Sequence, residues 1–398
     1  INYQRYFILL LLTAGLLTAL RASAQKTNNN YSVKGWWGPP PPPFSPVVQK
    51  DRHITFRIKA AHAAKAELLF GEWNIKPVPM QKDSAGTWSV TIPPVAPGIY
   101  SYVFLIDGVQ TVDKANPVTK SGTELYSSIV EVPGDSPRFD EIQNVPHGVI
   151  QSIRYTSTPL RRLRAMTVYL PPKYDTHLTE KFPVLYLRHG GGDNETSWSQ
   201  PAGRADIILE NLLAAQKAVP MIIVMTNGLT DGTWAGGSTP EGMKALEEEL
   251  LVDVIPLVEH RFRVKKQAGA RAIAGLSMGG GQSLVIGLRH PELFSWIGEF
   301  SSGLLSDKDF NRDTQWPGIM NASLNNRVKL LWIGCGTDDP RFPGHLDLVN
   351  NLQKRNIHYE FATVPGGHEW RVWRVSLHGF LQKIFREPVV YSKGTLQL

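Results

Sequence analysis

The chain has 398 residues, 42% hydrophobic and 19% charged, which is typical of a globular protein of two domains and excludes a disordered one. Its formal net charge is +7, but the basic residues are scattered singly and in pairs and no nucleic-acid motif accompanies them, which argues against a nucleic-acid partner. The single cysteine, Cys335, excludes an internal disulfide and a cysteine-rich zinc site.

The first residues have the pattern of a signal peptide. Arg5 precedes an apolar run over 6–20, and Ala22-Ser23-Ala24 follows as an A-x-A cleavage site. The run is shorter than the about 20 residues of a membrane span, and an uncleaved anchor is the alternative. We expect residues 1–24 to be removed, leaving a secreted or periplasmic bacterial protein without stable membrane insertion.

Two segments of different character follow. Residues 25–47 contain Trp36-Trp37 and five consecutive prolines, which predicts an extended polyproline spacer. From 48 to 134, short runs with alternating apolar and polar residues are separated by turn signals such as Pro97-Gly98. These runs are 53–60, 66–70, 87–92, 99–106 and 127–132. They predict a small β-sandwich domain.

After Pro133-Gly134 the pattern changes to that of an α/β domain. Mostly continuous apolar runs, typical of buried parallel strands, occur at 165–170, 183–188, 219–226, 271–274, 295–300 and 328–334. Helical periods lie between them, notably at 241–260 and 281–288. Strands that alternate with helices predict a doubly wound, mostly parallel sheet.

A candidate nucleophile lies in Gly275-Leu276-Ser277-Met278-Gly279, which matches the pattern G-x-S-x-G. The pattern alone is weak evidence, but a strand-like run precedes it and a helical one follows, as a nucleophile elbow requires. A glycine-rich turn with a capping serine is the structural alternative. The context favours Ser277 as the nucleophile of an acyl-transfer enzyme.

A serine hydroxyl needs a base, and in hydrolases with this elbow the acid and then the histidine follow the serine along the chain. The later histidines are His290, His345, His358, His368 and His378. His368 stands out because Pro-Gly-Gly-His places it on a tight loop after the strand-like run 359–364. The acid is expected after the strand 328–334, where Asp338 and Asp339 are adjacent, and spacing alone does not separate them.

The segment His189-Gly190-Gly191-Gly192 follows the strand 183–188 and can turn backbone N–H groups toward an oxyanion. The predicted donors are the N–H of Gly191, with Gly190 as the alternative, and the N–H of Met278. A phosphate-binding loop is the competing interpretation, but the segment lacks a Lys-Ser/Thr ending. Neither a zinc-binding H-E-x-x-H motif nor a dinucleotide fingerprint occurs, so we expect no metal and no cofactor.

Four segments in this order resemble the esterase D-type branch of the α/β-hydrolases, which includes feruloyl and acetylxylan esterases of carbohydrate esterase family one and the enterochelin esterases. The segments are 189–198, 271–283, 330–339 and 365–374. The resemblance covers roughly 145–388 and implies an α/β-hydrolase fold for that span. It also implies a triad of Ser277, Asp339 and His368 with Gly191 and Met278 as oxyanion donors, and it favours Asp339 over Asp338.

Residues 48–134 resemble an immunoglobulin-like early-set module of the glycogen-binding type, through Gly71-Glu72-Trp73, Gly86-Thr87-Trp88-Ser89 and Phe104 before Asp107-Gly108. Trp73 and Trp88 are candidates for stacking on a sugar, and packing within the domain is the alternative. A further alternative is that the module forms part of the active-site wall.

The substrate is where the sequence is least specific. Four tryptophans near the catalytic segments are candidates to line an aromatic or sugar pocket: Trp198, Trp234, Trp316 and Trp370. The resemblance implies an acylated polysaccharide or oligosaccharide, from which a secreted serine esterase removes feruloyl or acetyl groups. The alternatives are an enterochelin-type siderophore esterase and a non-catalytic glycan-binding protein on a hydrolase scaffold.

Overall fold

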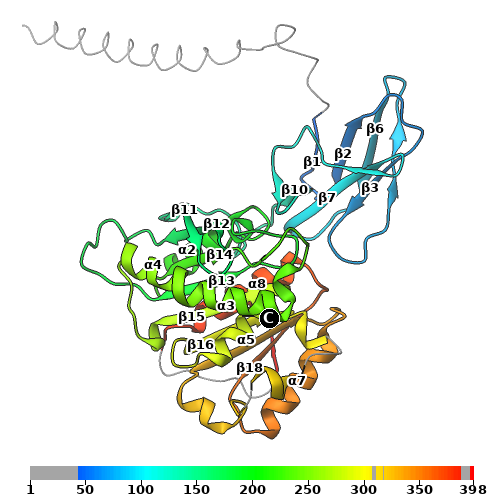
Figure 1. The fold of residues 1–398 in the computed structure, drawn as a ribbon. Coiled ribbons are helices and arrows are strands. Elements are labelled where there is room, and N and C mark those ends of the chain that lie inside the picture. The colour runs from blue at the N-terminus through cyan, green and yellow to red at the C-terminus, as the bar shows by residue number, and fades with distance from the viewer. Residues whose placement is uncertain (1–43, 307–310, 317, 387–394) are drawn as a thin grey trace, which may run out of the picture. The chain divides into compact units, whose positions relative to one another are not determined.

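The computed structural model describes residues 44–306, 311–316, 318–386 and 395–398. The predicted signal peptide and most of the predicted spacer lie outside these residues. Within them, no helix is long and apolar enough to cross a membrane. Residues from 44 onward belong to one compact unit, which contains two sheets of a β-sandwich and one large α/β sheet (Figure 1).

The sandwich consists of antiparallel strands in two sheets. The first sheet has the order β1 (Val47–Val48), β2 (Ile54–Lys59), β6 (Thr87–Ile92) and β5 (Gln81–Lys82). The second has the order β4 (Val78–Pro79), β3 (Ala66–Phe70), β7 (Gly98–Ile106), β10 (Leu125–Val132) and β9 (Thr119–Ser121), with β8 (Val109–Thr111) paired to β7. Alternate side chains of the strands, among them Phe56, Leu68 and Phe104, are fully buried between the sheets, as the period of two predicts.

The α/β sheet has nine strands. Their order is β11 (Val149–Ser157), β12 (Arg162–Leu170), β14 (Ile222–Thr226), β13 (Val184–Arg188), β15 (Arg271–Leu276), β16 (Trp296–Phe300), β17 (Leu330–Gly336), β18 (Glu360–Val364) and β19 (Thr395–Gln397). β11 and β12 form an antiparallel hairpin, and β12 pairs with β14 antiparallel. Every pair from β14 to β19 is parallel.

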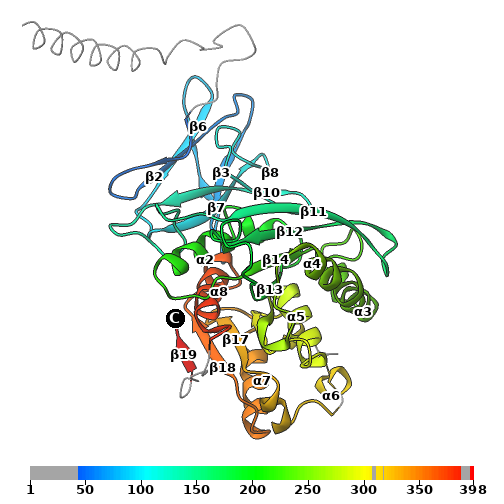
Figure 2. The ribbon, with the colours of Figure 1, turned by 90° about the vertical axis from the view of Figure 1, so that its left-hand side faces the viewer.

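Helices cover both faces of this sheet (Figure 2). One core contains side chains of α3 (Pro240–Glu249), α4 (Ile255–Arg261), α5 (Ser277–Arg289) and α7 (Phe342–Lys354); the other contains those of α2 (Ala205–Ala214) and α8 (Trp370–Lys383). Along β13, Tyr186 faces the first core, whereas Leu185 and Leu187 face the second. A strand buried on both faces is apolar at every position, which explains the continuous runs in the sequence.

The helical period over 241–260 forms two helices rather than one. A π-helical turn, Leu250–Val254, separates α3 from α4. Pro256 lies just after it and has no N–H to donate to the preceding turn. The short helix α6 (Arg312–Gln315) and five 3₁₀ turns complete the described helical structure: Ser197–Ser199, Gly236–Ser238, Ala268–Ala270, Leu304–Ser306 and Ala322–Asn326.

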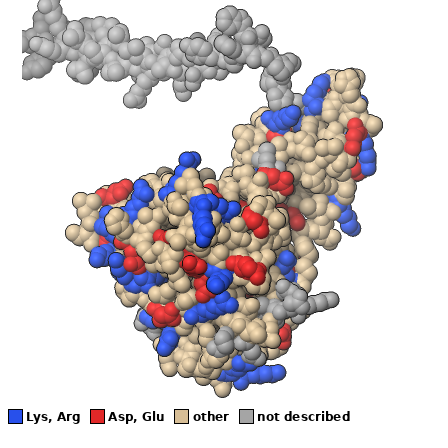
Figure 3. All heavy atoms as spheres, viewed as in Figure 1, with Lys and Arg blue, Asp and Glu red and all other residues tan. Residues whose placement is uncertain are grey.

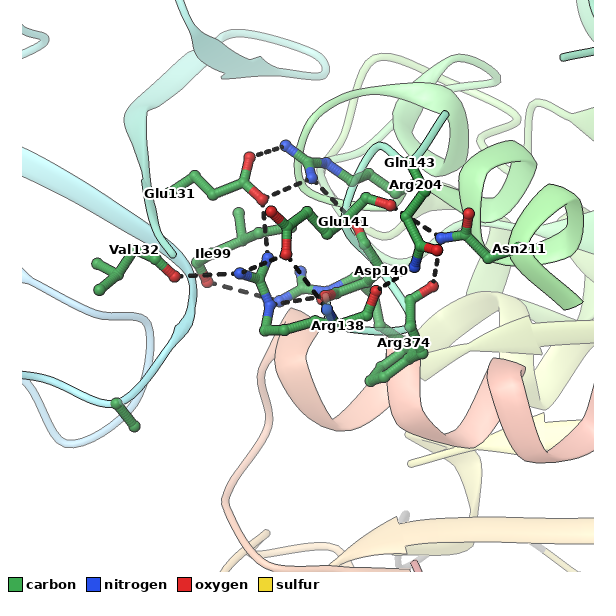
Figure 4. Close-up of polar contacts among 12 residues, drawn as sticks. Ile99, Glu131, Val132, Arg138, Asp140, Glu141, Gln143, Arg204, Asn211 and Arg374 are labelled. Carbon is green, nitrogen blue, oxygen red and sulfur yellow. Dashed lines mark hydrogen bonds and ion pairs between the residues drawn. The ribbon is translucent and has the colours of Figure 1, made fainter. Parts of the chain in front are cut away.

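Charged side chains join the sandwich to the α/β domain. Around Arg138, in the connection between them, lie Glu131 at the end of β10, Asp140 in the connection, Arg204 before α2 and Arg374 on α8 (Figure 4). On the face shown in Figure 3, basic and acidic side chains are interspersed.

Candidate active site

The carboxyl ends of parallel strands meet at one edge of a sheet, and four of them carry the candidate site residues. Ser277 follows β15 directly and is the first residue of α5. Its φ of 50° lies in the left-handed region, which costs a non-glycine residue roughly 1–2 kcal/mol. A Cβ on Gly279 would collide with the His189 carbonyl oxygen, so the tight strand-to-helix turn requires glycine there. This is the geometry of a nucleophile elbow.

His368 lies between Ser277 and Asp339. Its Nε2 is 2.9 Å from Ser277 Oγ, and its Nδ1 is 2.7 Å from Asp339 Oδ2. The Asp339 side chain is 0% exposed. Burial raises the pKa of Asp339, but the hydrogen bond and positive charge offered by His368 outweigh burial and lower the pKa below its usual value. The carboxylate therefore stays ionised and can hold the imidazole in one orientation.

The two adjacent aspartates have different surroundings. Asp338 is exposed, and its backbone N–H donates to the Gly366 carbonyl over 2.9 Å. Asp339 points inward, and its second carboxylate oxygen accepts the Arg341 N–H over 2.9 Å. The structure thus brings Asp339 to His368 and leaves Asp338 at the surface.

The glycine-rich loop after β13 is held by a buried histidine. His189 Nε2 accepts the Gly228 N–H over 2.8 Å, so Nδ1 carries the proton and donates to the Gly190 carbonyl over 2.7 Å. Burial lowers the pKa of His189 to about 4, which keeps this ring neutral at neutral pH. Because C=O and N–H point to opposite sides of a trans peptide, holding the Gly190 carbonyl also sets the direction of the Gly191 N–H.

The loop and the start of α5 lie side by side at the nucleophile. A Cβ built on Gly190 would be 3.4 Å from the Ser277 Cβ. Met278 is the second residue of α5, and the N–H groups in the first turn of a helix have no partner within the helix. Both predicted oxyanion donors, Gly191 and Met278, are therefore beside Ser277.

A pocket of about 410 Å³ opens at Ser277 and His368. The α/β domain contributes Gly190, Gly191, Asp193, Trp234, Leu276, Trp370 and Trp373 to its wall. The sandwich contributes Leu69, Gly71, Glu72, Ile75, Ser101, Tyr102, Val103, Gln110, Lys120, Tyr126 and Ser127. The sandwich therefore forms part of the wall of this pocket, as one alternative from the sequence proposes.

Two of the four candidate substrate tryptophans line the pocket. Trp234 is 60% exposed and covers Gly191, and Trp370 lies near Lys120. The prediction is wrong for Trp198 and Trp316, because both are buried in the core. The Trp198 indole donates to the Arg188 carbonyl over 2.9 Å and packs edge-on against Trp370, behind the wall. Trp316 belongs to the core on the α5 side of the sheet.

The two sandwich tryptophans also differ. Trp88 is buried, and its indole N–H donates to the Ala60 carbonyl over 2.9 Å, so its ring belongs to the sandwich core. Trp73 lies against Gly367, where a Cβ would collide with its ring. It therefore packs beside the loop that carries His368.

Sequence reasoning did not find several residues of the pocket. The Glu72 carboxylate accepts a hydrogen bond from the backbone N–H of Trp370 over 2.8 Å, and the Lys120 ammonium group donates to Asp193. Both come from the sandwich. The segment Gly71-Glu72-Trp73 carries the resemblance to a sugar-binding module but does not identify Trp370 as the partner of Glu72, and no motif marks Lys120. In the described part of the chain, no group of three or more His, Cys, Asp and Glu side chains is placed to hold a metal ion.

Comparison with known proteins places the chain in a family. The Esterase family model matches residues 157–384, more than half of the chain. An endo-1,4-β-xylanase/feruloyl esterase of Xylanibacter ruminicola is 31% identical over 349 residues, which are 86% of this chain and 46% of that protein. The chain spans about half the length of the curated relatives it matches.

Solved structures share the fold. A ferulic acid esterase of Anaeromyces mucronatus has a TM-score of 0.53 at 24% identity, and the alignment covers 62% of this chain and 93% of the Anaeromyces chain. The enterobactin esterase of Shigella flexneri has a TM-score of 0.62 at 18% identity, and the alignment covers 85% of this chain and 96% of the Shigella chain. The predicted α/β-hydrolase fold after a small all-β domain is thus confirmed, and the chain belongs to the Esterase family.

Proposed function

We propose that this chain is a secreted serine esterase that removes feruloyl or acetyl groups from plant cell-wall polysaccharide such as arabinoxylan. The observation that carries the proposal is the hydrogen-bonded series Ser277, His368 and Asp339 at the base of a pocket with aromatic and apolar walls. The 31% identity to a xylanase/feruloyl esterase supports a xylan-related substrate. Export rests on the signal-peptide pattern of residues 1–24.

The geometry supports an acyl-enzyme mechanism. Ser277 Oγ attacks the ester carbonyl carbon while His368 Nε2 takes the hydroxyl proton, and Asp339 stabilises the imidazolium. The N–H groups of Gly191 and Met278 hold the tetrahedral oxyanion. His368 then gives its proton to the departing sugar oxygen as the ester C–O bond breaks. Water attacks the acyl-enzyme by the same route, which releases the carboxylic acid and restores the Ser277 hydroxyl.

The wall of the pocket favours an aromatic acyl group. Trp234 and the partly exposed Tyr126 offer ring surface, and Leu69 and Ile75 add apolar contacts. Trp370 also lines the wall, although only 3% of its surface is exposed. A feruloyl ring gains from stacking against aromatic side chains, whereas an acetyl group fills little of about 410 Å³. Among the two acyl groups, we therefore expect the feruloyl ester to have the higher kcat/KM.

The first test is Ser277→Ala. The variant should fold as the wild type does by circular dichroism and lose about four to six orders of magnitude in kcat on p-nitrophenyl acetate. Turnover at the wild-type rate would reject Ser277 as the nucleophile.

The second test compares methyl ferulate, acetylated xylan and a catecholate trilactone as substrates for the wild type. Preference for methyl ferulate supports the proposal, whereas preference for the trilactone assigns the chain to siderophore-ester hydrolysis. No turnover of any ester, together with retention of the chain on insoluble xylan, indicates a non-catalytic glycan-binding protein.

A further inference from the structure

The sandwich holds the glycine-rich loop of the candidate site. Three groups from residues 119–126 of the sandwich converge on the Gly192 carbonyl: the Thr123 N–H at 2.8 Å, the Thr123 hydroxyl at 3.1 Å and the Tyr126 hydroxyl at 2.9 Å. The chain runs so close that a Cβ on Gly122 would collide with the same carbonyl oxygen. The loop that carries the proposed oxyanion donor is therefore held from the other domain.

A buried ion pair connects the sandwich to the α/β domain at the same place. Lys120 Nζ lies 2.7 Å from Asp193 Oδ1, and the two side chains are only 15% and 5% exposed. Lys120 also lies over the ring of Tyr126, 4.7 Å from its centroid. A carboxylate this deeply buried is costly without a partner, and Lys120 is the only cation among the described residues that forms an ion pair with it.

The carboxylate of Asp193 lies near the place where negative charge develops. A Cβ built on Gly190 would be 3.7 Å from Asp193 Oδ2 and 3.4 Å from the Ser277 Cβ, so the carboxylate and the nucleophile flank the same glycine. An uncompensated negative charge beside the oxyanion would oppose its formation, and the poorly solvated surroundings strengthen that repulsion. Burial raises the pKa of Asp193, whereas the charge and the hydrogen bond of Lys120 oppose that rise and balance the charge of the ionised carboxylate.

The sandwich is fixed well enough to keep Lys120 in place. Glu131, at the end of β10, accepts two hydrogen bonds from the Arg204 guanidinium and one from Arg138 (Figure 4). Glu72 of the sandwich accepts the Trp370 N–H at the start of α8. These contacts join the two domains independently of Lys120, so the position of Lys120 relative to Asp193 does not depend on its own ion pair alone.

We propose that the sandwich takes part in catalysis. Thr123 and Tyr126 hold the Gly192 carbonyl and so fix the position of the oxyanion loop. Lys120 compensates the charge of Asp193 and so sets the electrostatic potential at that loop. Lys120 is a positioning residue, because it acts through Asp193 and the loop. The inference rests on the proposed function, since it needs a nucleophile at Ser277 and an oxyanion at this loop. It assigns the sandwich a role in the chemical step, which an independent carbohydrate-binding module would not have.

The sign of the charge makes the inference testable. Lys120→Met leaves Asp193 uncompensated, so kcat for methyl ferulate should fall about 10- to 100-fold, with KM within about threefold of the wild type. Asp193→Asn leaves a positive charge, which does not oppose the oxyanion, and should cost less than Lys120→Met. The double variant Lys120→Met/Asp193→Asn should recover most of the loss, and Lys120→Arg should retain most of the activity.

A boronic acid provides a second readout, because its serine adduct is tetrahedral and negatively charged like the intermediate. The inhibition constant of phenylboronic acid should rise in Lys120→Met by about the same factor as kcat/KM falls. Lys65→Met, which removes an exposed lysine paired with Glu67 in the sandwich, is the matched control and should leave both unchanged. Circular dichroism and thermal unfolding identify a variant that has lost its fold.

Two results would overturn the inference: kcat of Lys120→Met within twofold of the wild type, or equal losses in Lys120→Met and Asp193→Asn with no recovery in the double variant. The second result would indicate a packing role without an electrostatic one. Failure of the proposed function is distinguished by Ser277→Ala. If that variant keeps its activity, the nucleophile is wrong, whereas an inactive Ser277→Ala beside a fully active Lys120→Met rejects only the role of the sandwich.

Discussion

At the scale of single residues, one turn presents two neighbouring carboxylates to different surroundings. Only Asp339 contacts His368, so Asp339→Asn should remove the charge that stabilises the imidazolium and lower kcat about 10³- to 10⁴-fold. Asp338→Asn changes an exposed side chain and should stay within about twofold of the wild type. Both are measured on p-nitrophenyl acetate at pH 7.5, and the reverse order would move the assignment by one residue.

His189 offers a second test at this scale, because its two ring nitrogens have different partners. An amide in His189→Asn can still donate to the Gly190 carbonyl, whereas His189→Gln keeps only an acceptor near the Gly228 N–H. If the Gly190 contact orients the Gly191 N–H, the Gln variant should lose about 10- to 100-fold more kcat than the Asn variant. Equal losses would show that the ring serves only to fill the core.

At the scale of elements, β16, β17 and α7 meet beneath the candidate acid. His345 on α7 lies 3.2 Å from Glu299 on β16, and both side chains are fully buried. His345 Nδ1 donates to the Arg341 carbonyl, and the Arg341 N–H donates to Asp339. Burial lowers the pKa of His345, but the Glu299 carboxylate and the Cys335 side chain together outweigh burial and raise the pKa well above its usual value. The start of α7, and with it Asp339, is therefore anchored by a buried ion pair.

This ion pair predicts a pH dependence of stability. The unfolded chain releases the His345 proton near pH 6.5, whereas the folded chain keeps it to higher pH. The contribution of the pair is therefore complete below about pH 6.5 and is lost as the pH rises toward the raised pKa, by up to about 1.4 kcal/mol per unit. In urea unfolding, the difference between wild type and Glu299→Gln should shrink from pH 6 to pH 9. A constant difference would contradict the charged pair.

At the scale of the whole described unit, the charged network around Arg138 joins the two domains. Arg374 is buried on α8, where its Nε lies 2.8 Å from Asp140 Oδ2. Arg374→Met leaves part of this buried carboxylate without its cation, and the free energy of unfolding should fall by about 3 kcal/mol. Lys65→Met breaks an ion pair whose lysine is largely exposed to solvent and should cost no more than about 1 kcal/mol. Urea denaturation followed by tryptophan fluorescence measures both, and equal effects would argue against the network.

Local patterns predict most of this architecture, because buried parallel strands and glycine-rich turns are legible over a few residues. The edge strand β11 was not predicted from the sequence, because its side chains are largely exposed and form no continuous apolar run. The motif residues Ser277, Asp339 and His368 meet in the structure because each follows the carboxyl end of a parallel strand. The contacts of Glu72 with Trp370 and of Lys120 with Asp193 could not be predicted, since the partners lie far apart along the chain and only the packing of two domains brings them together.

The contact between Gly122 and the Gly192 carbonyl has a consequence for how such a protein can change. The interface between the two domains lines the pocket, so replacing the sandwich with that of a relative should disturb the candidate active site. In a chimaera, a bulkier residue at 122 would displace the glycine-rich loop, and the loss of a cation at 120 would leave Asp193 without its partner, even if each domain folded correctly. Loss of the positive charge at 120 would have to be accompanied by loss of the negative charge at 193, so the two domains would be expected to evolve together at this contact.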